Sequence, residues 1–315
     1  MGRARGPDRR TPDGVIPTVP LAVTDLHVRY RDGAEAVRGI DLTVRDGERV
    51  AIVGESGCGK TSLLRACLGL LPAGGQATGS VVVAGTEVIG APSAVLRALR
   101  GKIVGYVPQD PLRACDPLRR VVDHVGESWK VHGMRPGRGT ASELLTQLGI
   151  HKAALPGYPH QWSGGMLQRA TIAAATAHRP PLTLADEPTS ALDADLADDV
   201  LHALSTNSRA LLLVTHDLGL LRRHVDTIAI CYAGRVVETG DAEEVLGSPR
   251  HPYTRALLAA SPRKSGGLPV PLGGAPPAPS QPDAGCAFAP RCQEVVPLCW
   301  QGIPPLTGGV ACVRR

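Results

Sequence analysis

The sequence predicts an α/β fold in which a mainly parallel sheet is covered by crossover helices. Short apolar runs at Val50–Val53, Leu182–Ala185, Leu211–Thr215 and Thr227–Tyr232 alternate with segments of helical pattern. Such alternation is typical of parallel strands that are joined by helices. A glycine-rich segment at 54–59 ends the first run, and a helical pattern follows it directly. These observations predict a strand–loop–helix unit inside the sheet.

The other elements follow from the same periodicities in chain order. Residues 21–54 alternate in the manner of strands, and Val50–Val53 is continuous enough to be buried on both faces. Ser163 precedes a helical pattern and can cap its first turn. Helical segments are expected at 63–68, 118–150, 163–178, 193–205 and 217–224, and further strands at 81–83 and 103–107.

Composition limits the classes of function. The chain has 315 residues, 43% of them hydrophobic, and a formal net charge of +5, which is too small to indicate nucleic-acid binding. The sequence lacks an apolar run of about 18 residues and the apolar stretch of a secretory signal. We therefore expect a protein of the cytoplasm without a transmembrane segment. Residues 1–20 are basic and rich in Pro and Gly, and we expect a disordered tail there.

The C-terminal part, residues 249–315, differs in composition from the preceding chain. Residues 262–285 hold seven Pro and five Gly in 24 positions, the composition of a linker. The segment 286–315 carries four of the eight cysteines, spaced C-x₅-C-x₆-C-x₁₂-C: Cys286, Cys292, Cys299 and Cys312.

A segment as short as 286–315 usually needs a covalent or metal staple to stay folded, and disulfides are disfavoured in a reducing compartment. Zinc and a [4Fe–4S] cluster both suit four thiolates. No gap is as short as zinc sites usually have, which favours the cluster and leaves zinc or no metal as alternatives.

The glycine-rich segment fits the phosphate-loop pattern G-x-x-x-x-G-K-[ST]. Glycines let backbone N–H groups turn toward phosphate oxygens, and the helix N-terminus adds partial positive charge. Lys60 can reach the β- and γ-phosphates of a nucleotide, and Thr61 can bind Mg²⁺. The expected ATP-binding residues here are Gly54, Glu55, Ser56, Gly57, Cys58, Gly59, Lys60, Thr61 and Ser62.

A second motif, which is acidic, completes a phosphate-transfer site. The apolar run at 182–185 ends in Asp186 and Glu187. Asp186 can hold Mg²⁺, and Glu187 can orient or activate the attacking water. The sequence therefore predicts MgATP hydrolysis, with Glu187 and Lys60 among the catalytic residues.

The segment Trp162-Ser163-Gly164-Gly165-Met166-Leu167-Gln168-Arg169 resembles the signature motif of ABC ATPases. The resemblance implies a RecA-like core with an antiparallel β subdomain, and a helical subdomain at about 110–178 within a nucleotide-binding domain at 21–248. It also implies that ATP is bound between two subunits, so that the signature of one meets the ATP of the other. The positions that match the family's other motifs carry these implied roles: Tyr30 stacks on adenine, Gln109 senses Mg²⁺ and the membrane partner, Ser163, Gly164 and Gly165 face the partner's γ-phosphate, Asp193 lies in the loop that meets the opposite subunit, and His216 contacts the γ-phosphate.

The C-terminal motifs resemble the dipeptide/oligopeptide/nickel importer branch of that family, in its D-type form. They are the His-Pro-Tyr segment at 251–258 and the cysteine segment that begins at 285. The branch implies a second ATPase subunit, two membrane permeases and an extracytoplasmic binding protein, with this chain on the cytoplasmic face of the membrane. Some importers of this branch carry a [4Fe–4S] cluster in the tail. We expect peptide cargo.

Alternatives to a peptide importer stay open. A nickel or metallophore importer uses the same type of ATPase. An ABC exporter lacks the His-Pro-Tyr motif, which makes that class a weaker fit. A DNA-repair ABC ATPase usually has a long insertion before the signature, whereas only 103 positions separate Lys60 from Ser163 here.

Overall fold

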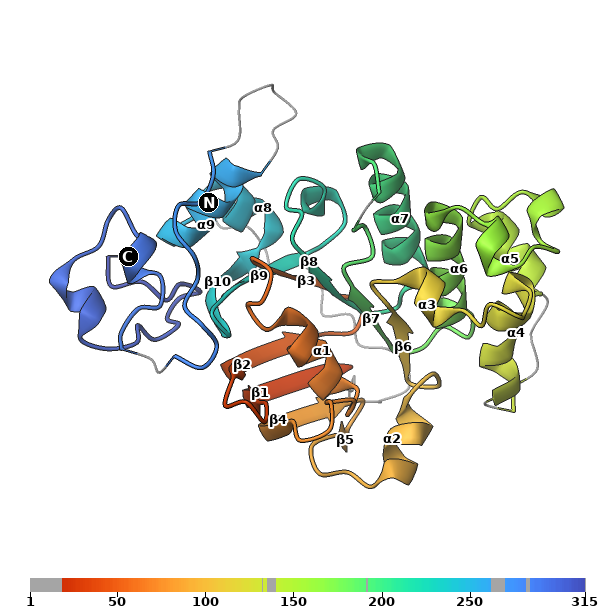
Figure 1. Ribbon diagram of the computed structural model, residues 1–315, viewed down its shortest axis with the longest axis horizontal. Helices are drawn as coiled ribbons and strands as arrows, with labels where there is room; N and C mark the ends of the chain where they lie inside the picture. Colours follow the sequence, from red (N-terminus) through yellow and green to blue (C-terminus); the bar gives the residue numbers. More distant parts are fainter. Residues whose placement is uncertain are drawn as a thin grey trace, which may run out of the picture.

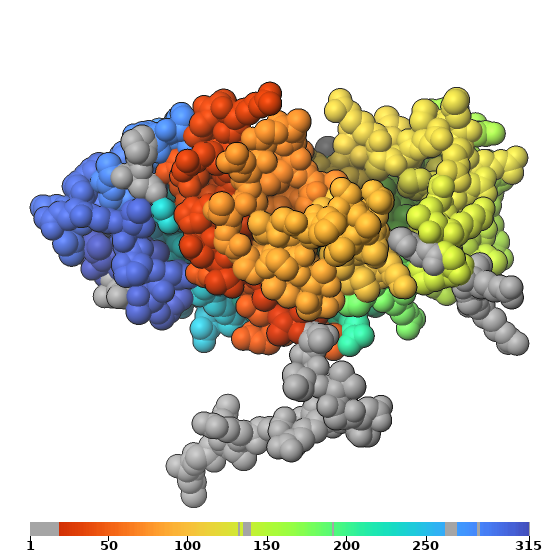
Figure 2. Space-filling view, turned by 90° about the horizontal axis from the view of Figure 1, so that it is seen from below, coloured from red at the N-terminus to blue at the C-terminus, as the bar shows by residue number. Residues whose placement is uncertain are grey.

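The computed structural model describes residues 19–131, 133–134, 140–190, 192–261, 270–281 and 284–314. The tail expected at 1–20 therefore lies almost entirely outside the described residues. Two sheets occupy the centre of the molecule, a group of helices lies at one end and the C-terminal tail at the other (Figure 1). Seen from below, the tail lies beside the first strands of the chain, and the helices within residues 111–147 are at the far end (Figure 2).

The larger sheet has six strands in the order β10-β9-β3-β8-β7-β6. All neighbouring strands are parallel except β9 and β10, which form an antiparallel pair at one edge. The predicted α/β class is confirmed. The strands are β3 (Arg49–Val53), β6 (Val104–Val107), β7 (Leu182–Asp186), β8 (Leu211–Thr215), β9 (Thr227–Tyr232) and β10 (Arg235–Asp241).

The smaller sheet is antiparallel, with strand order β2-β1-β4-β5. Its central strand β1 pairs with β2 on one side and with β4 on the other. Helix α1 contacts β1, β2 and β4 of this sheet and β7 of the larger sheet. Leu63 and Leu64 of α1 are fully buried, so this helix joins the two sheets. The bounds are β1 (Leu21–Arg29), β2 (Glu35–Val44), β4 (Gln76–Val83), β5 (Thr86–Glu87) and α1 (Lys60–Cys67).

Strand β3 is buried on both of its faces. Val50 and Ile52 belong to the core shared with α1 and the antiparallel sheet. Ala51 and Val53 belong to the second core, which contains side chains from the helices within residues 121–207. Successive side chains of a strand point to opposite faces, so a continuous apolar run is what this central position requires.

The region expected to be helical at 118–150 contains two separate helices. Gly133 has φ +64°, the left-handed conformation that commonly ends a helix, just after α4. Helix α5 then begins at Thr140, whose side chain and Glu143 form a reciprocal cap. The helices of this end are α3 (Pro111–Ala114), α4 (Val121–Val131), α5 (Ala141–Gln147) and α6 (Gly164–Thr176), with 3₁₀ turns η1 (Lys152–Ala154) and η2 (Pro159–Gln161).

A helix expected at 217–224 is reduced to a 3₁₀ turn, η3 (Leu221–Arg223). The N–H of Asp217 donates to the hydroxyl of Thr215, and the N–H of Gly219 donates to the carboxylate of Asp217. These contacts form local turns over residues 215–219 in place of the first turn of a helix. The remaining helices are α2 (Ser93–Leu99), α7 (Ala194–Asn207), α8 (Ala242–Gly247) and α9 (Pro252–Ala260).

The C-terminal tail contains two 3₁₀ turns, η4 (Ala289–Arg291) and η5 (Pro297–Trp300). Phe288 is 3% exposed and packs edge-on against the rings of Tyr232 and Tyr253. The described part of the expected linker also lies on the core, because Arg38 donates to the carbonyls of Pro279 and Gln281. No helix in the described ranges is long and apolar enough to cross a bilayer.

Candidate nucleotide-binding site

The phosphate loop connects β3 to α1 in a path that only glycine permits at two positions. A Cβ on Gly54 would lie 2.1 Å from the carbonyl oxygen of Cys231. A Cβ on Gly59 would lie 2.0 Å from the carbonyl oxygen of Ala36, and Gly59 has φ +102°. The loop is therefore pressed against β9 and β2. Its free side remains available for a ligand, since a Cβ on Gly57 would meet no atom within 4 Å.

Lys60 is the cation of this loop and is 5% exposed. Its Nζ donates to the carbonyls of Gly54 at 2.7 Å and Glu55 at 3.0 Å, and it lies 3.8 Å from Glu187 Oε1. The lysine thus closes the loop on itself and faces the acidic end of β7. An ammonium group in this position can transfer its contacts to phosphate oxygens.

Asp186 and Thr61 come together at the base of the site. The Thr61 hydroxyl donates to Asp186 Oδ1 at 3.1 Å. Asp186 is 2% exposed, and this burial raises the pKa of its carboxyl group above the usual value. A hard cation would stabilise the buried carboxylate, so the chemistry of this pair suits Mg²⁺.

Glu187 lies at the centre of three of the predicted side chains. Its Oε2 accepts from Gln109 Nε2 at 3.2 Å and lies 3.3 Å from His216 Nδ1, while Oε1 faces Lys60. Glu187 has φ +43°, a left-handed conformation that is uncommon outside glycine, and its N–H donates to the Val214 carbonyl. Strained backbone of this kind is frequent at functional sites. The fold therefore gathers the ends of β6, β7 and β8 around one carboxylate.

The other predicted residues lie around this centre or apart from it. Tyr30 is hydrogen-bonded to Ser62 at 2.8 Å, at the start of α1. Ser163 caps α6 by accepting from the N–H of Met166, and Asp193 caps α7 by accepting from Leu196. In the described residues no hydrogen bond or ion pair links the segment 163–165 to the phosphate loop. The signature segment is therefore not part of the same single-chain pocket.

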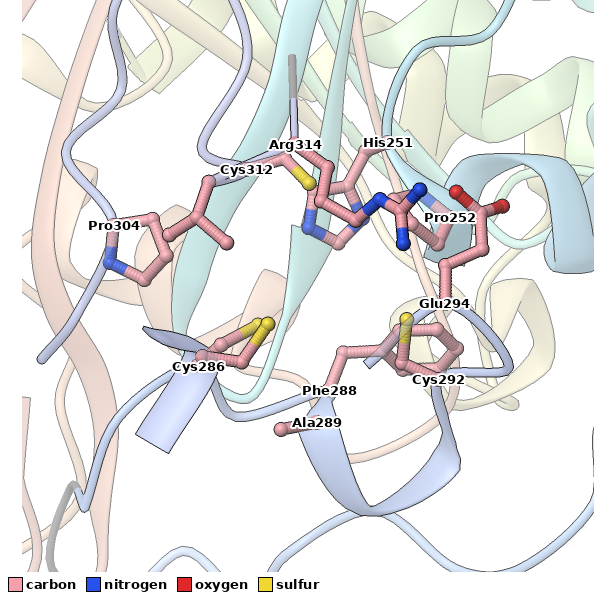
Figure 3. A pocket seen from close by; sticks show the side chains of 12 residues that line it. His251, Pro252, Cys286, Phe288, Ala289, Cys292, Glu294, Pro304, Cys312 and Arg314 are labelled. Carbon is pink, nitrogen blue, oxygen red and sulfur yellow. The ribbon is translucent and has the colours of Figure 1, made fainter. Parts of the chain in front are cut away.

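The four tail cysteines line one pocket, together with His251 and Phe288. Figure 3 shows Cys286, Cys292 and Cys312 around this space. All four are free thiols, and burial raises the pKa of Cys286 and Cys292. Among the described residues, however, no group of three or more His, Cys, Asp or Glu is arranged to hold a metal ion. The expected cluster, and zinc as its alternative, both stay predictions.

Contacts between the tail and the phosphate loop were not predicted from the sequence. The guanidinium of Arg291 forms an ion pair with Glu55 at 2.7 Å, and the Glu55 N–H donates to the hydroxyl of Tyr253 at 3.0 Å. Arg291 directly precedes Cys292, but nothing in the spacing links it to a residue 236 positions away. The sequence signal nearest to this contact was the His-Pro-Tyr segment, because its tyrosine, Tyr253, accepts the hydrogen bond from Glu55.

Comparison with known families and proteins identifies the chain. The ABC transporter family matches residues 37–190, and the oligopeptide/dipeptide transporter C-terminal region matches residues 237–299. The oligopeptide transport ATP-binding protein OppD of Mycobacterium tuberculosis is 40% identical over 93% of this chain. The chain spans about half of that relative, 52% of its length. The dipeptide transport ATP-binding protein DppD of Bacillus subtilis is 35% identical over 91% of this chain and 90% of its own length.

Solved structures agree with the fold. A dimeric ATP-binding cassette in a post-hydrolysis state, bound to ADP and Pi, aligns with 70% of this chain and 98% of its own, with 25% identity and a TM-score of 0.62. CbiO1 of Clostridium perfringens aligns with 73% of this chain and 92% of its own, with 24% identity and a TM-score of 0.61. The motifs, the sheet order and the relatives lead to one assignment. The chain is a member of the ABC transporter family, in the group of ATP-binding proteins that carry the oligopeptide/dipeptide transporter C-terminal region.

Proposed function

We propose that this chain is the ATP-hydrolysing subunit of an importer that takes up peptides. The observation that carries the proposal is the position of Glu187, between Lys60, Gln109 and His216 and next to Asp186. Residues 21–248 would form the nucleotide-binding domain, with 110–178 as its helical subdomain. Residues 249–315 would be an extension specific to peptide importers, a role supported by the matching C-terminal family.

The phosphate loop and the end of β7 would hold MgATP. Backbone N–H groups of residues 54–62 and the ammonium of Lys60 would bind the phosphates, in place of the loop carbonyls that Lys60 now contacts. Thr61 and Asp186, already hydrogen-bonded, would bind Mg²⁺ with help from Gln109. Mg²⁺ would neutralise charge on the phosphates, and Tyr30 would stack on the adenine.

Glu187 would accept a proton from, or orient, the water that attacks the γ-phosphate. Its neighbours support that role, since Gln109 and His216 each reach Oε2 and fix the direction of the carboxylate. His216 is more than half exposed, which leaves its ring free to turn toward a bound γ-phosphate. In-line transfer of the γ-phosphoryl group to water needs mainly this positioning and stabilisation of charge from the protein.

The site would be completed by a second ATPase subunit. Ser163 and Gly164 are exposed at the start of α6, where N–H groups point outward from a helix N-terminus. Asp193 would lie in the loop that meets the same partner. Two membrane permeases would follow the opening and closing of the pair, which places this chain at the cytoplasmic face of a membrane. An extracytoplasmic binding protein would deliver the cargo, and no nucleic acid is expected.

Peptide uptake in proteoliposomes is the direct test of the cargo. The ATPase chain is assembled with the permeases and binding protein of its transporter, and a labelled dipeptide or oligopeptide is offered with ATP inside the vesicles. We expect ATP-dependent uptake that Lys60→Ala abolishes. Uptake of a nickel chelate or metallophore instead of peptide would move the chain to the metal-importing class, and ATP-driven efflux would make it an exporter.

We further propose that Cys286, Cys292, Cys299 and Cys312 hold a [4Fe–4S] cluster. Their position around one pocket supports this. Each thiolate of such a cluster binds a different iron, whereas a zinc ion needs all four sulfurs at about 2.3 Å from one atom. The cysteine spacing, in which no gap is as short as zinc sites usually have, favours the cluster over zinc.

Metal analysis of anaerobically purified protein tests this assignment. We expect a brown protein with about four irons per chain, and loss of iron and colour in Cys292→Ser. Cys115→Ser is the matched control, because Cys115 is a buried thiol outside the tail. Colourless protein with one zinc per chain would show that the cysteines bind zinc and not a cluster. Metal-free protein would refute both assignments.

A further inference from the structure

The C-terminal tail contacts the phosphate loop through a shielded ion pair. Arg291 Nη1 donates to Glu55 Oε2 at 2.7 Å, and Nη2 donates to Oε1 at 3.0 Å. Nη1 also lies 3.2 Å from the hydroxyl of Tyr232, and Nε donates to the carbonyl of Gly273. The Arg291 side chain is 5% exposed and that of Glu55 25%. A two-pronged pair of this kind fixes both charge and geometry.

The main chain of Glu55 is held from the same side. Its N–H donates to the hydroxyl of Tyr253, which is fully buried among the rings of Tyr232 and Phe288. The carbonyl of Glu55 accepts from Lys60. The tail therefore reaches the loop residue that also contacts the phosphate-binding cation.

Arg291 is in turn fixed by the turn that leads into the cysteine pocket. Its N–H donates to the carbonyl of Phe288, and the N–H of Cys292 donates to the carbonyl of Ala289. Figure 3 shows Phe288, Ala289 and Cys292 on this turn, at the wall of the pocket. The position of the guanidinium thus depends on the structure of the tail.

We propose that Arg291 is a positioning residue of the nucleotide site, which holds and neutralises Glu55 so that the tail sets the affinity of the loop for ATP. This inference rests on the proposed function, because it requires that the loop binds ATP. Without Arg291, a carboxylate without a partner would stand beside the site of a polyanion and repel it. The loop would also lose the ion pair that joins Glu55 to the tail. Both changes weaken ATP binding.

The test is ATP binding to the full chain, measured by calorimetry, with thermal unfolding recorded in parallel. Arg291→Gln should raise the Kd for MgATP about tenfold, the scale of a lost hydrogen-bonded ion pair. Adding Glu55→Gln should recover most of that loss, because it removes the repelling charge. Glu294→Gln is the matched control: it removes the ion pair with Arg255 inside the same tail, away from the loop, and should leave the Kd unchanged.

A conservative variant keeps the inference testable if Arg291→Gln does not fold. Arg291→Lys keeps the charge but not the two-pronged contact, and should give a Kd between those of the wild type and Arg291→Gln. Wild-type affinity in Arg291→Gln, or weaker binding in the double variant than in Arg291→Gln, would overturn the inference. If the wild type itself binds no ATP, the proposed function fails, independently of Arg291.

Discussion

At the scale of single residues, the nucleotide site depends on charges that the fold brings together from distant strands. Glu187 faces Lys60 from the phosphate loop, Gln109 from the end of β6 and His216 from the end of β8. The phosphate-loop and acidic motifs predicted Lys60 and Glu187, and the family resemblance implied Gln109 and His216. Their meeting at one carboxylate follows from the sheet, because parallel strands end on the same edge.

Lys60→Ala should abolish tight ATP binding. The change removes the cation of the phosphate loop and its two hydrogen bonds to the Gly54 and Glu55 carbonyls. Calorimetry with MgATP checks this, with Lys152→Ala as a control, since Lys152 is an exposed lysine of η1, outside the phosphate loop. Unchanged affinity in Lys60→Ala would show that this loop does not hold the phosphates.

The sequence did not reveal the residues of the C-terminal tail that contact the phosphate loop. Arg291 and Glu55 are 236 positions apart, and neither periodicity nor spacing relates them. Phe288 was part of a cysteine motif, yet it belongs to the aromatic core with Tyr232 and Tyr253. Such contacts depend on where the chain returns after the last strand, which local propensities do not fix.

At the scale of elements, prediction succeeded where an apolar pattern was strong and failed where side chains compete with the helix. The buried strands β3, β7, β8 and β9 and the cap of α6 by Ser163 were predicted. The helix expected at 217–224 was wrong, because residues 215–219 form side-chain-to-backbone turns and the helical part is the short 3₁₀ turn η3. Strand β10 was missed because residues 235–241 are only partly apolar, and it is stabilised by pairing with β9.

Gly164→Ala should separate folding from function at the start of α6. A Cβ at Gly164 meets no atom within 4 Å, and alanine favours a helix by up to about 1 kcal/mol. We expect the Tm to stay constant or rise. ATP hydrolysis by the assembled transporter should fall roughly tenfold, because the methyl group obstructs the N–H groups that face the partner's phosphate.

Gly165→Ala provides the contrast. A Cβ there would lie 2.4 Å from the side chain of Leu196 on α7, so this variant should lower the Tm. If Gly164→Ala hydrolyses ATP normally while remaining folded, the signature segment does not act on a nucleotide.

At the scale of the whole molecule, the proposed function divides each ATP site between two chains. The phosphate loop and Glu187 lie together, whereas Ser163 to Gly165 make no hydrogen bond or ion pair with them in the part of the chain that the structure describes. The shared-site arrangement was predicted from family resemblance alone, since no periodicity in one chain encodes a partner.

Hydrolysis per chain should therefore depend on protein concentration. We expect the rate to rise faster than linearly with concentration, or on addition of the partner ATPase and permeases. Phosphate release measured across a dilution series checks this. A fully active chain at high dilution would show that the site is complete within one subunit.

The central claim is that Glu187 acts on the attacking water of ATP hydrolysis, and it is tested most directly by Glu187→Gln. The measurement is phosphate release and MgATP affinity in one preparation of the assembled transporter. The amide keeps the shape of the side chain and loses its ability to accept a proton. The account predicts wild-type or tighter ATP binding with phosphate release reduced by about 10²–10⁴-fold. Near-normal phosphate release in Glu187→Gln would contradict it.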